Sequence, residues 1–137
     1  MPTFMTPSPF LRLALVGDAI ASGGTGLLLS GGAGYLTSVL GLPVPLMHYT
    51  GLFLLAYAAF VGYVGMRAAM SKGVIWAIII ANSIWAVESL LALLGGWLSP
   101  TPLGTAFVIA QALVVAGFAQ AQWIGLRKSN TTTLADA

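Results

Sequence analysis

The sequence predicts an all-α fold, a polytopic membrane protein built as a four-transmembrane-helix bundle. Of its 137 residues, 58% are hydrophobic and 6% are charged, whereas an ordinary soluble domain is about 25% charged. Four segments are apolar over about 20 residues each, which is the length that crosses a bilayer. Clusters of glycine and proline separate these segments. The length indicates one membrane domain covering residues 1–137.

The four predicted spans are joined by short connections. They cover residues 10–30, 45–68, 73–97 and 102–126. The first span is expected to end at its cluster of glycines, and residues 33–40 to lie flat at the membrane interface. Pro102 suits the first turn of the last helix, because the backbone N–H that it lacks needs no partner there. Membrane strands are not expected, since no segment alternates in the ten-residue units of a barrel.

The basic residues predict how the bundle is oriented. All five lie at one end of the bundle, at the start of the first span, around the connection between the second and third, or after the fourth: Arg12, Arg67, Lys72, Arg127 and Lys128. The two connections at the other end contain none. The positive-inside rule therefore predicts that both termini are cytoplasmic, in a multi-pass protein of the bacterial inner membrane. The small polar residues after Lys128 predict a frayed tail.

The two predicted hairpins resemble one another in sequence. A shift of 64 positions places Asp18 on Asn82, and a shift of 60 places residues 63–67 on residues 123–127. Both hairpins begin on the same side, so the repeat would be a parallel one about an axis along the membrane normal. We therefore expect two pseudo-repeated helical hairpins packed as a four-helix bundle.

Six polar residues within the spans or at their rim are candidate functional residues. They are Asp18, Asn82, Glu88, Ser89, Gln111 and His48. Asp18 and Asn82 lie at the same predicted depth, so we expect a hydrogen bond between them. Glu88 lies nearer the opposite side, where Gln111 reaches a comparable depth and is expected to bond to it. An acid inside a span is either a proton or cation relay or a hydrogen-bond donor between helices, and the sequence leaves both open.

A ridge of small residues follows the first span. It begins at Asp18 and continues at every fourth position with Ser22, Gly26, Ser30 and Gly34. Ridges of this kind let two helix backbones approach closely. We expect this one to contact the third span or another protein. The alternative is that residues 23–26 unwind and expose carbonyl groups to an ion.

Composition argues against several kinds of chemistry. The net charge of +2 comes from scarce acids rather than from a basic patch, which argues against nucleic-acid binding. Cysteine is absent and His48 is the only histidine, so no metal or other cofactor is expected. The acids within the spans lie deep while His48 lies at the rim, so a Ser–His–acid triad is not expected. We expect a protein that is not an enzyme.

Short segments resemble known families. The D-A-I-A-S-G run that starts at Asp18 and the A-N-S-I-W block at 81–85 resemble small four-span bacterial inner-membrane proteins, the DoxX-like group among them. That resemblance implies the fold and location. A short four-span chain with a glutamate inside a span also resembles the small multidrug resistance transporters. Those transporters carry their glutamate in the first span, whereas Glu88 lies in the third. Residues 47–50 spell the M-H-Y-T signature of a membrane sensor domain once.

Two functions are consistent with these observations. The first is a non-catalytic accessory or scaffold subunit that packs into a larger membrane complex through its helix faces. The second is a small homo-oligomeric transporter coupled to protons or cations through Glu88 and Asp18, because four helices alone enclose little more than their own side chains. The expected partners are the lipid bilayer and either other membrane subunits or further copies of this chain.

Overall fold

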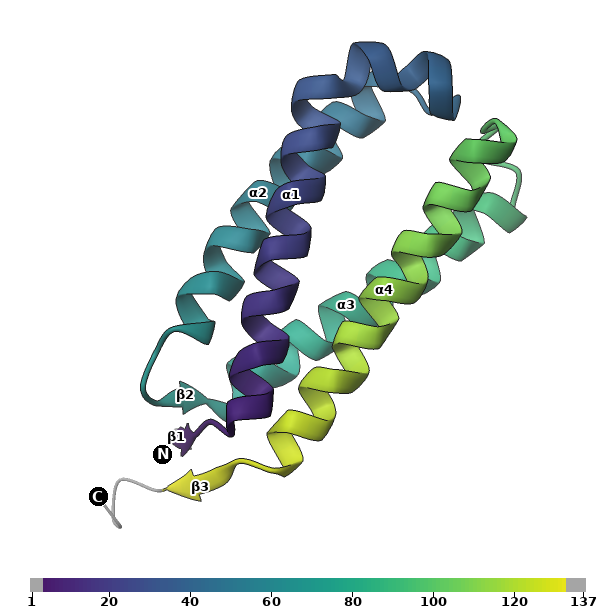
Figure 1. Ribbon diagram of the computed structural model, residues 1–137. Coiled ribbons are helices and arrows are strands. Elements are labelled where there is room, and N and C mark those ends of the chain that lie inside the picture. The colour runs from purple at the N-terminus through teal and green to yellow at the C-terminus, as the bar shows by residue number, and fades with distance from the viewer. Residues whose placement is uncertain (1–3, 133–137) are drawn as a thin grey trace.

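A computed structural model, which describes residues 4–132, has the predicted all-α architecture of four long helices (Figure 1). The helices are α1 (Pro9–Leu40), α2 (Val44–Gly65), α3 (Lys72–Leu94) and α4 (Pro102–Arg127). All four are long and apolar enough to cross a membrane. The prediction of a multi-pass membrane protein with a four-helix bundle is thereby confirmed.

Local sequence determines where α1 and α4 begin and where α1 ends. The Ser8 hydroxyl accepts the N–H of Leu11 at 3.1 Å at the start of α1, and the Thr101 hydroxyl accepts the N–H of Gly104 at 3.0 Å at the start of α4. Such side chains replace the partners that the first turn of a helix lacks. Helix α1 ends at Gly41, whose φ of 71° lies in the left-handed region that glycine adopts at low cost.

The first helix is longer than predicted. The expected break at residues 31–34 is wrong, because α1 continues without interruption to Leu40. Its 32 residues correspond to about 48 Å at about 1.5 Å per residue, which exceeds the roughly 30 Å of a hydrocarbon core. Figure 1 shows the last turns of α1 bending aside across the end of the bundle. Residues 33–40 are therefore an extension of α1 rather than a separate segment.

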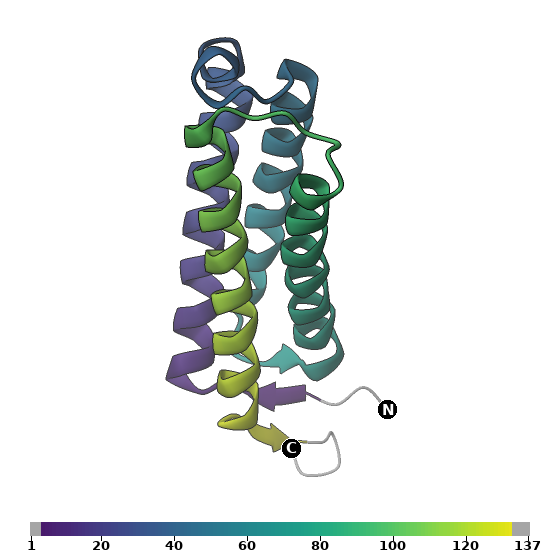
Figure 2. The same ribbon diagram turned by 90° about the vertical axis from the view of Figure 1, so that its right-hand side faces the viewer.

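A short antiparallel sheet closes the opposite end of the bundle. Strand β1 (Phe4–Thr6) pairs with β2 (Met70–Ser71) on one side and with β3 (Asn130–Thr132) on the other. Figure 2 shows the three strands together beneath the helices. The prediction of a frayed tail is wrong for residues 130–132, whose backbone pairs with β1, and the rest of that tail lies outside the described residues.

The basic residues lie near the sheet end of the bundle, and three of them cover aromatic rings. Nζ of Lys128 lies 4.9 Å from the centre of the Phe10 ring. The guanidinium of Arg67 lies 5.3 Å from the centre of the Tyr63 ring, and that of Arg127 lies 4.9 Å from the centre of the Trp123 ring. A cation above an aromatic face is attracted by the ring's negative charge density. Aromatic and basic side chains are also the groups that anchor helices at a membrane–water interface.

The small-residue ridge of α1 packs on α2. A Cβ atom added to Gly26 would lie 2.8 Å from the carbonyl oxygen of Gly51, so only glycine allows this close approach of the two backbones. The close backbone contact of the ridge is therefore with α2 rather than with the third span, which the ridge reaches through the side chain of Asp18. The alternative of an unwound segment is wrong, because residues 23–26 are helical. At the far end of the ridge, Gly34 faces open space.

The two hairpins are not related as closely as the predicted repeat implies. In a bundle with that symmetry, the α1–α4 contact and the α2–α3 contact would be alike. Instead α1 packs closely on α4, while α2 and α3 make few close backbone contacts. Figure 1 shows the hairpins separating above the sheet, until the last turns of α1 bend over to the start of α4. The structure therefore has one closed seam and one open seam.

Candidate functional site

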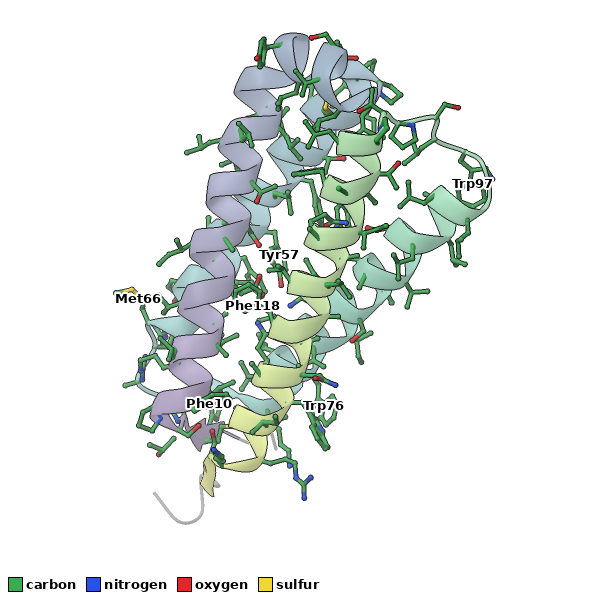
Figure 3. The ribbon with its side chains drawn as sticks, turned by 45° about the vertical axis from the view of Figure 1, so that its right-hand side comes forward. Phe10, Tyr57, Met66, Trp76, Trp97 and Phe118 are labelled. Carbon is green, nitrogen blue, oxygen red and sulfur yellow. The ribbon has the colours of Figure 1, made fainter. Side chains whose placement is uncertain are left out.

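Four polar side chains, one from each helix, meet inside the bundle. This polar cluster consists of Asp18, Tyr57, Asn82 and Gln122. Asp18, Asn82 and Gln122 are 2%, 5% and 0% exposed, so neither lipid nor water reaches them freely. Figure 3 shows Tyr57 directed between the helices.

Asp18 is the centre of the polar cluster. Its Oδ2 accepts from Nδ2 of Asn82 at 2.9 Å and from Nε2 of Gln122 at 2.8 Å. The other oxygen, Oδ1, accepts from the hydroxyl of Ser22 at 3.1 Å. The predicted hydrogen bond between Asp18 and Asn82 is confirmed. Every side chain that hydrogen-bonds to the carboxyl of Asp18 is neutral. These hydrogen bonds supply the partners that a buried polar group requires.

The Tyr57 hydroxyl joins the polar cluster from α2. It lies 2.9 Å from Oδ2 of Asp18 and 2.8 Å from Oδ1 of Asn82, and Nδ2 of Asn82 lies 3.0 Å from Oε1 of Gln122. Tyr57 and Gln122 were not among the residues predicted from the sequence. The signal for Tyr57 was its place in the middle of a span, since tyrosine usually lies at the interface and needs a partner when buried.

A cavity of about 630 Å³ lies between the hairpins, in the half of the bundle away from the sheet. All four helices line it, and most of the lining is apolar, including Leu29, Met47, Leu54 and Phe107. Its walls include long stretches of α2 and α3, the two helices that make few close backbone contacts. Volume and lining are typical of a site for a small molecule, for which the usual range is about 300–1,000 Å³.

The cavity contains few polar groups, and Glu88 is one of them. The predicted bond between Gln111 and Glu88 is wrong. Oε1 of Gln111 accepts instead from the indole N–H of Trp85 at 2.9 Å, and its Nε2 donates to the carbonyl of Val108 at 2.9 Å. On α3 it is therefore Trp85 that reaches Gln111 of α4, whereas Glu88 is exposed.

Two further predicted residues lie at or near the cavity. Ser89 lines it, and the Ser89 hydroxyl donates to the carbonyl of Trp85 at 2.8 Å. His48 is exposed near the end of the bundle, with Nδ1 3.2 Å from the carbonyl oxygen of Ser30. His48 is therefore a residue of the rim, as predicted, rather than of the cavity wall.

Aromatic rings connect the cavity to the polar cluster. The Phe53 ring stacks on Trp85, with 6.2 Å between ring centres, and on Tyr57, with 6.4 Å. Trp85 belongs to the cavity lining and Tyr57 to the polar cluster. The two predicted acids therefore belong to two neighbouring but separate sites, with Glu88 in the cavity and Asp18 in the cluster.

Within residues 4–132, no group of three or more His, Cys, Asp or Glu side chains is placed to hold a metal ion. Every buried side-chain nitrogen or oxygen in the same range has a hydrogen-bond partner, so the polar cluster is complete without an added group. No protein-family model, no curated protein and no solved structure matches this chain.

Proposed function

We propose that the protein binds a lipid-soluble small molecule in the cavity between its hairpins. The observation that carries this proposal is the cavity itself, which combines a volume of about 630 Å³ with an apolar lining and a few polar groups. Sites for small ligands are built in this way, since apolar walls supply affinity and isolated polar groups fix orientation. The open seam between α2 and α3 gives such a molecule a route from the lipid.

Glu88 defines the chemical class of the ligand. Glu88 is exposed and is one of the residues that line the cavity, and an acid at membrane depth needs a partner or a function. The best partner is an amine, because a hydrogen bond between ions is roughly twice as strong as a neutral one. We therefore infer an amphiphile with an apolar body and one amino group. This proposal develops the transport alternative of the sequence analysis, in which Glu88 handles a cation.

The test uses the tryptophans of the cavity wall. With the protein in phosphatidylcholine nanodiscs, 1-naphthylmethylamine is expected to change the fluorescence of Trp85 and Trp97 saturably. Ala92→Phe, which places a ring in the cavity, is expected to weaken binding at least tenfold. Glu88→Gln is expected to weaken binding of the amine about tenfold, or about 1.4 kcal/mol, and to leave binding of 1-methylnaphthalene unchanged.

Ala110→Phe is the matched control for the cavity. Ala110 is exposed on α4 outside the cavity lining, so its replacement adds the same ring without filling the site. An unchanged titration in Ala92→Phe would contradict the proposal. So would equal loss of the amine and of 1-methylnaphthalene in Glu88→Gln.

An accessory or scaffold subunit remains the second candidate function, and a surface hollow favours it. A hollow of about 560 Å³ lies on the α3–α4 face. Its lining includes the small residues Ser83, Ala86, Ala116 and Gly117, which let another helix approach closely. Gentle purification from the native membrane distinguishes the candidates, because a stoichiometric second polypeptide would favour this one.

We further propose that the protein lies in the bacterial inner membrane with both termini cytoplasmic. The supporting observation is that the sheet end holds the basic residues. The chain lacks cysteine, so the exposed Ala69 and Ser99 can each be replaced by a single cysteine at opposite ends of the bundle. A membrane-impermeant maleimide added to spheroplasts is expected to label Ser99→Cys, and to label Ala69→Cys only after lysis. The reverse pattern would overturn the orientation.

A further inference from the structure

We propose that Asp18 carries a proton in the folded protein, and that the polar cluster is a buried proton-binding site. This site is separate from the cavity and does not depend on what the cavity binds. It rests on the contacts among Asp18, Tyr57, Asn82 and Gln122, and on the number of protons that these groups can supply.

The decisive geometry surrounds the Tyr57 hydroxyl. Its two neighbours, Oδ2 of Asp18 at 2.9 Å and Oδ1 of Asn82 at 2.8 Å, are both at hydrogen-bond distance. A tyrosine hydroxyl has one proton to donate. If Asp18 were ionised, both neighbours would be acceptors, and one of the two contacts would join two oxygens with no proton between them.

A proton on Oδ2 of Asp18 removes this deficit. The Asp18 hydroxyl then donates to the oxygen of Tyr57, and the Tyr57 hydroxyl donates to Oδ1 of Asn82. The same Oδ2 still accepts from the amides of Asn82 and Gln122. The two protons on Nδ2 of Asn82 serve Asp18 and Oε1 of Gln122. With one added proton, every contact in the cluster is a hydrogen bond.

Turning the amides does not replace the added proton. Amide orientation is judged from the hydrogen-bond network. If Asn82 is turned, its oxygen faces Oδ2 of Asp18 and Oε1 of Gln122, and two contacts lack a proton. If Gln122 is turned instead, its nitrogen faces the nitrogen of Asn82. Each alternative leaves more unsatisfied contacts than the orientation in the structure, so the cluster is one proton short whenever Asp18 is ionised.

The surroundings of Asp18 contain no compensating charge among the groups that contact it. The side chains that face it are Ser22 from its own helix, Tyr57 from α2, Asn82 from α3 and Gln122 from α4, and of these only Tyr57 is titratable. Arg12, the nearest cation in the sequence, donates to the carbonyl of Gly65 at 2.6 Å. Burying a carboxylate without a cation is costly.

Isotope-edited infrared spectroscopy tests the proposal on the whole chain in lipid nanodiscs at neutral pH. The sequence has two aspartates, Asp18 and Asp136, so the Asp136→Asn variant grown with [4-13C]aspartate has one labelled carboxyl. The labelled-minus-unlabelled spectrum is expected to show a shift of the C=O stretch of a protonated carboxylic acid. A shift confined to the symmetric and antisymmetric stretches of a carboxylate would overturn the proposal. No residue of the cluster is altered, so folding is unaffected.

A second measurement tests the position of the proton. Tyr57→Phe removes the oxygen that accepts it, so the C=O band of Asp18 is expected to change frequency or to be replaced by carboxylate bands. Tyr49→Phe is the matched control, because Tyr49 is also on α2 but is 69% exposed. A band that is identical in the Tyr57→Phe variant and in the parent would overturn the assignment of the proton to the Asp18–Tyr57 contact.

Discussion

Gly125→Ala is expected to destabilise the bundle by about 2 kcal/mol, although alanine normally favours a helix by about 1 kcal/mol over glycine. A Cβ at this position would lie 2.6 Å from Cα and 2.8 Å from the backbone nitrogen of Leu11. Overpacking of this kind typically costs about 1–3 kcal/mol. The backbone of α1 resists displacement here, because the Ser8 hydroxyl donates to the Gly125 carbonyl at 2.9 Å. Thermal unfolding in detergent measures the loss.

Gly117→Ala provides the comparison within the same helix. Nothing lies within 4 Å of a Cβ at Gly117, so this variant is expected to be as stable as the parent or slightly more so. Equal stability of the two variants would show that the α1–α4 contact does not require glycine at Gly125.

Asn82→Leu is expected to destabilise the protein by about 3 kcal/mol or more. Asn82 contacts Asp18, Tyr57 and Gln122, and leucine can replace none of these hydrogen bonds. A buried polar group that loses its partner costs about 1–3 kcal/mol, and here three groups each lose one. Chemical unfolding in mixed micelles measures the difference.

Ser83→Ala is the control for the loss of a polar side chain on α3. Ser83 follows Asn82 directly, but it is exposed and its hydroxyl bonds only to the carbonyl of Ile79, at 2.8 Å. This variant is expected to change stability by less than about 0.5 kcal/mol. If Asn82→Leu were as mild as Ser83→Ala, the polar cluster would not be a determinant of the fold.

The fold was predictable because a bilayer imposes long apolar helices, but the rotation of each helix was not. In a span, apolar side chains face both lipid and core, so the pattern does not mark the inner face. The hydrogen bond between Asp18 and Asn82 could be predicted because polar groups buried at equal depth in a bundle can bond to each other. Gln111 and Gln122 lie on one helix, and its depth, rotation and tilt together decide which of them meets Asn82.

Two further differences between the predicted and the observed fold have other causes. The extension of α1 through its glycines was missed because glycine weakens a helix without ending it, and the actual end requires the left-handed backbone of Gly41. The sheet was missed because each strand has only two or three residues. Such short strands are stable only through pairing between segments that are far apart in the sequence.

The sheet also determines how the molecule can deform. Because β1 is hydrogen-bonded to both β2 and β3, the two hairpins are joined at the sheet end, and the bonds of Thr101 to the carbonyls of Val39 and Leu40 join them again at the other end. Between these two joints, α2 and α3 make few close backbone contacts. Thermal motion is therefore expected to change the width of the cavity along the α2–α3 seam, while the polar cluster, which is hydrogen-bonded across all four helices, stays assembled.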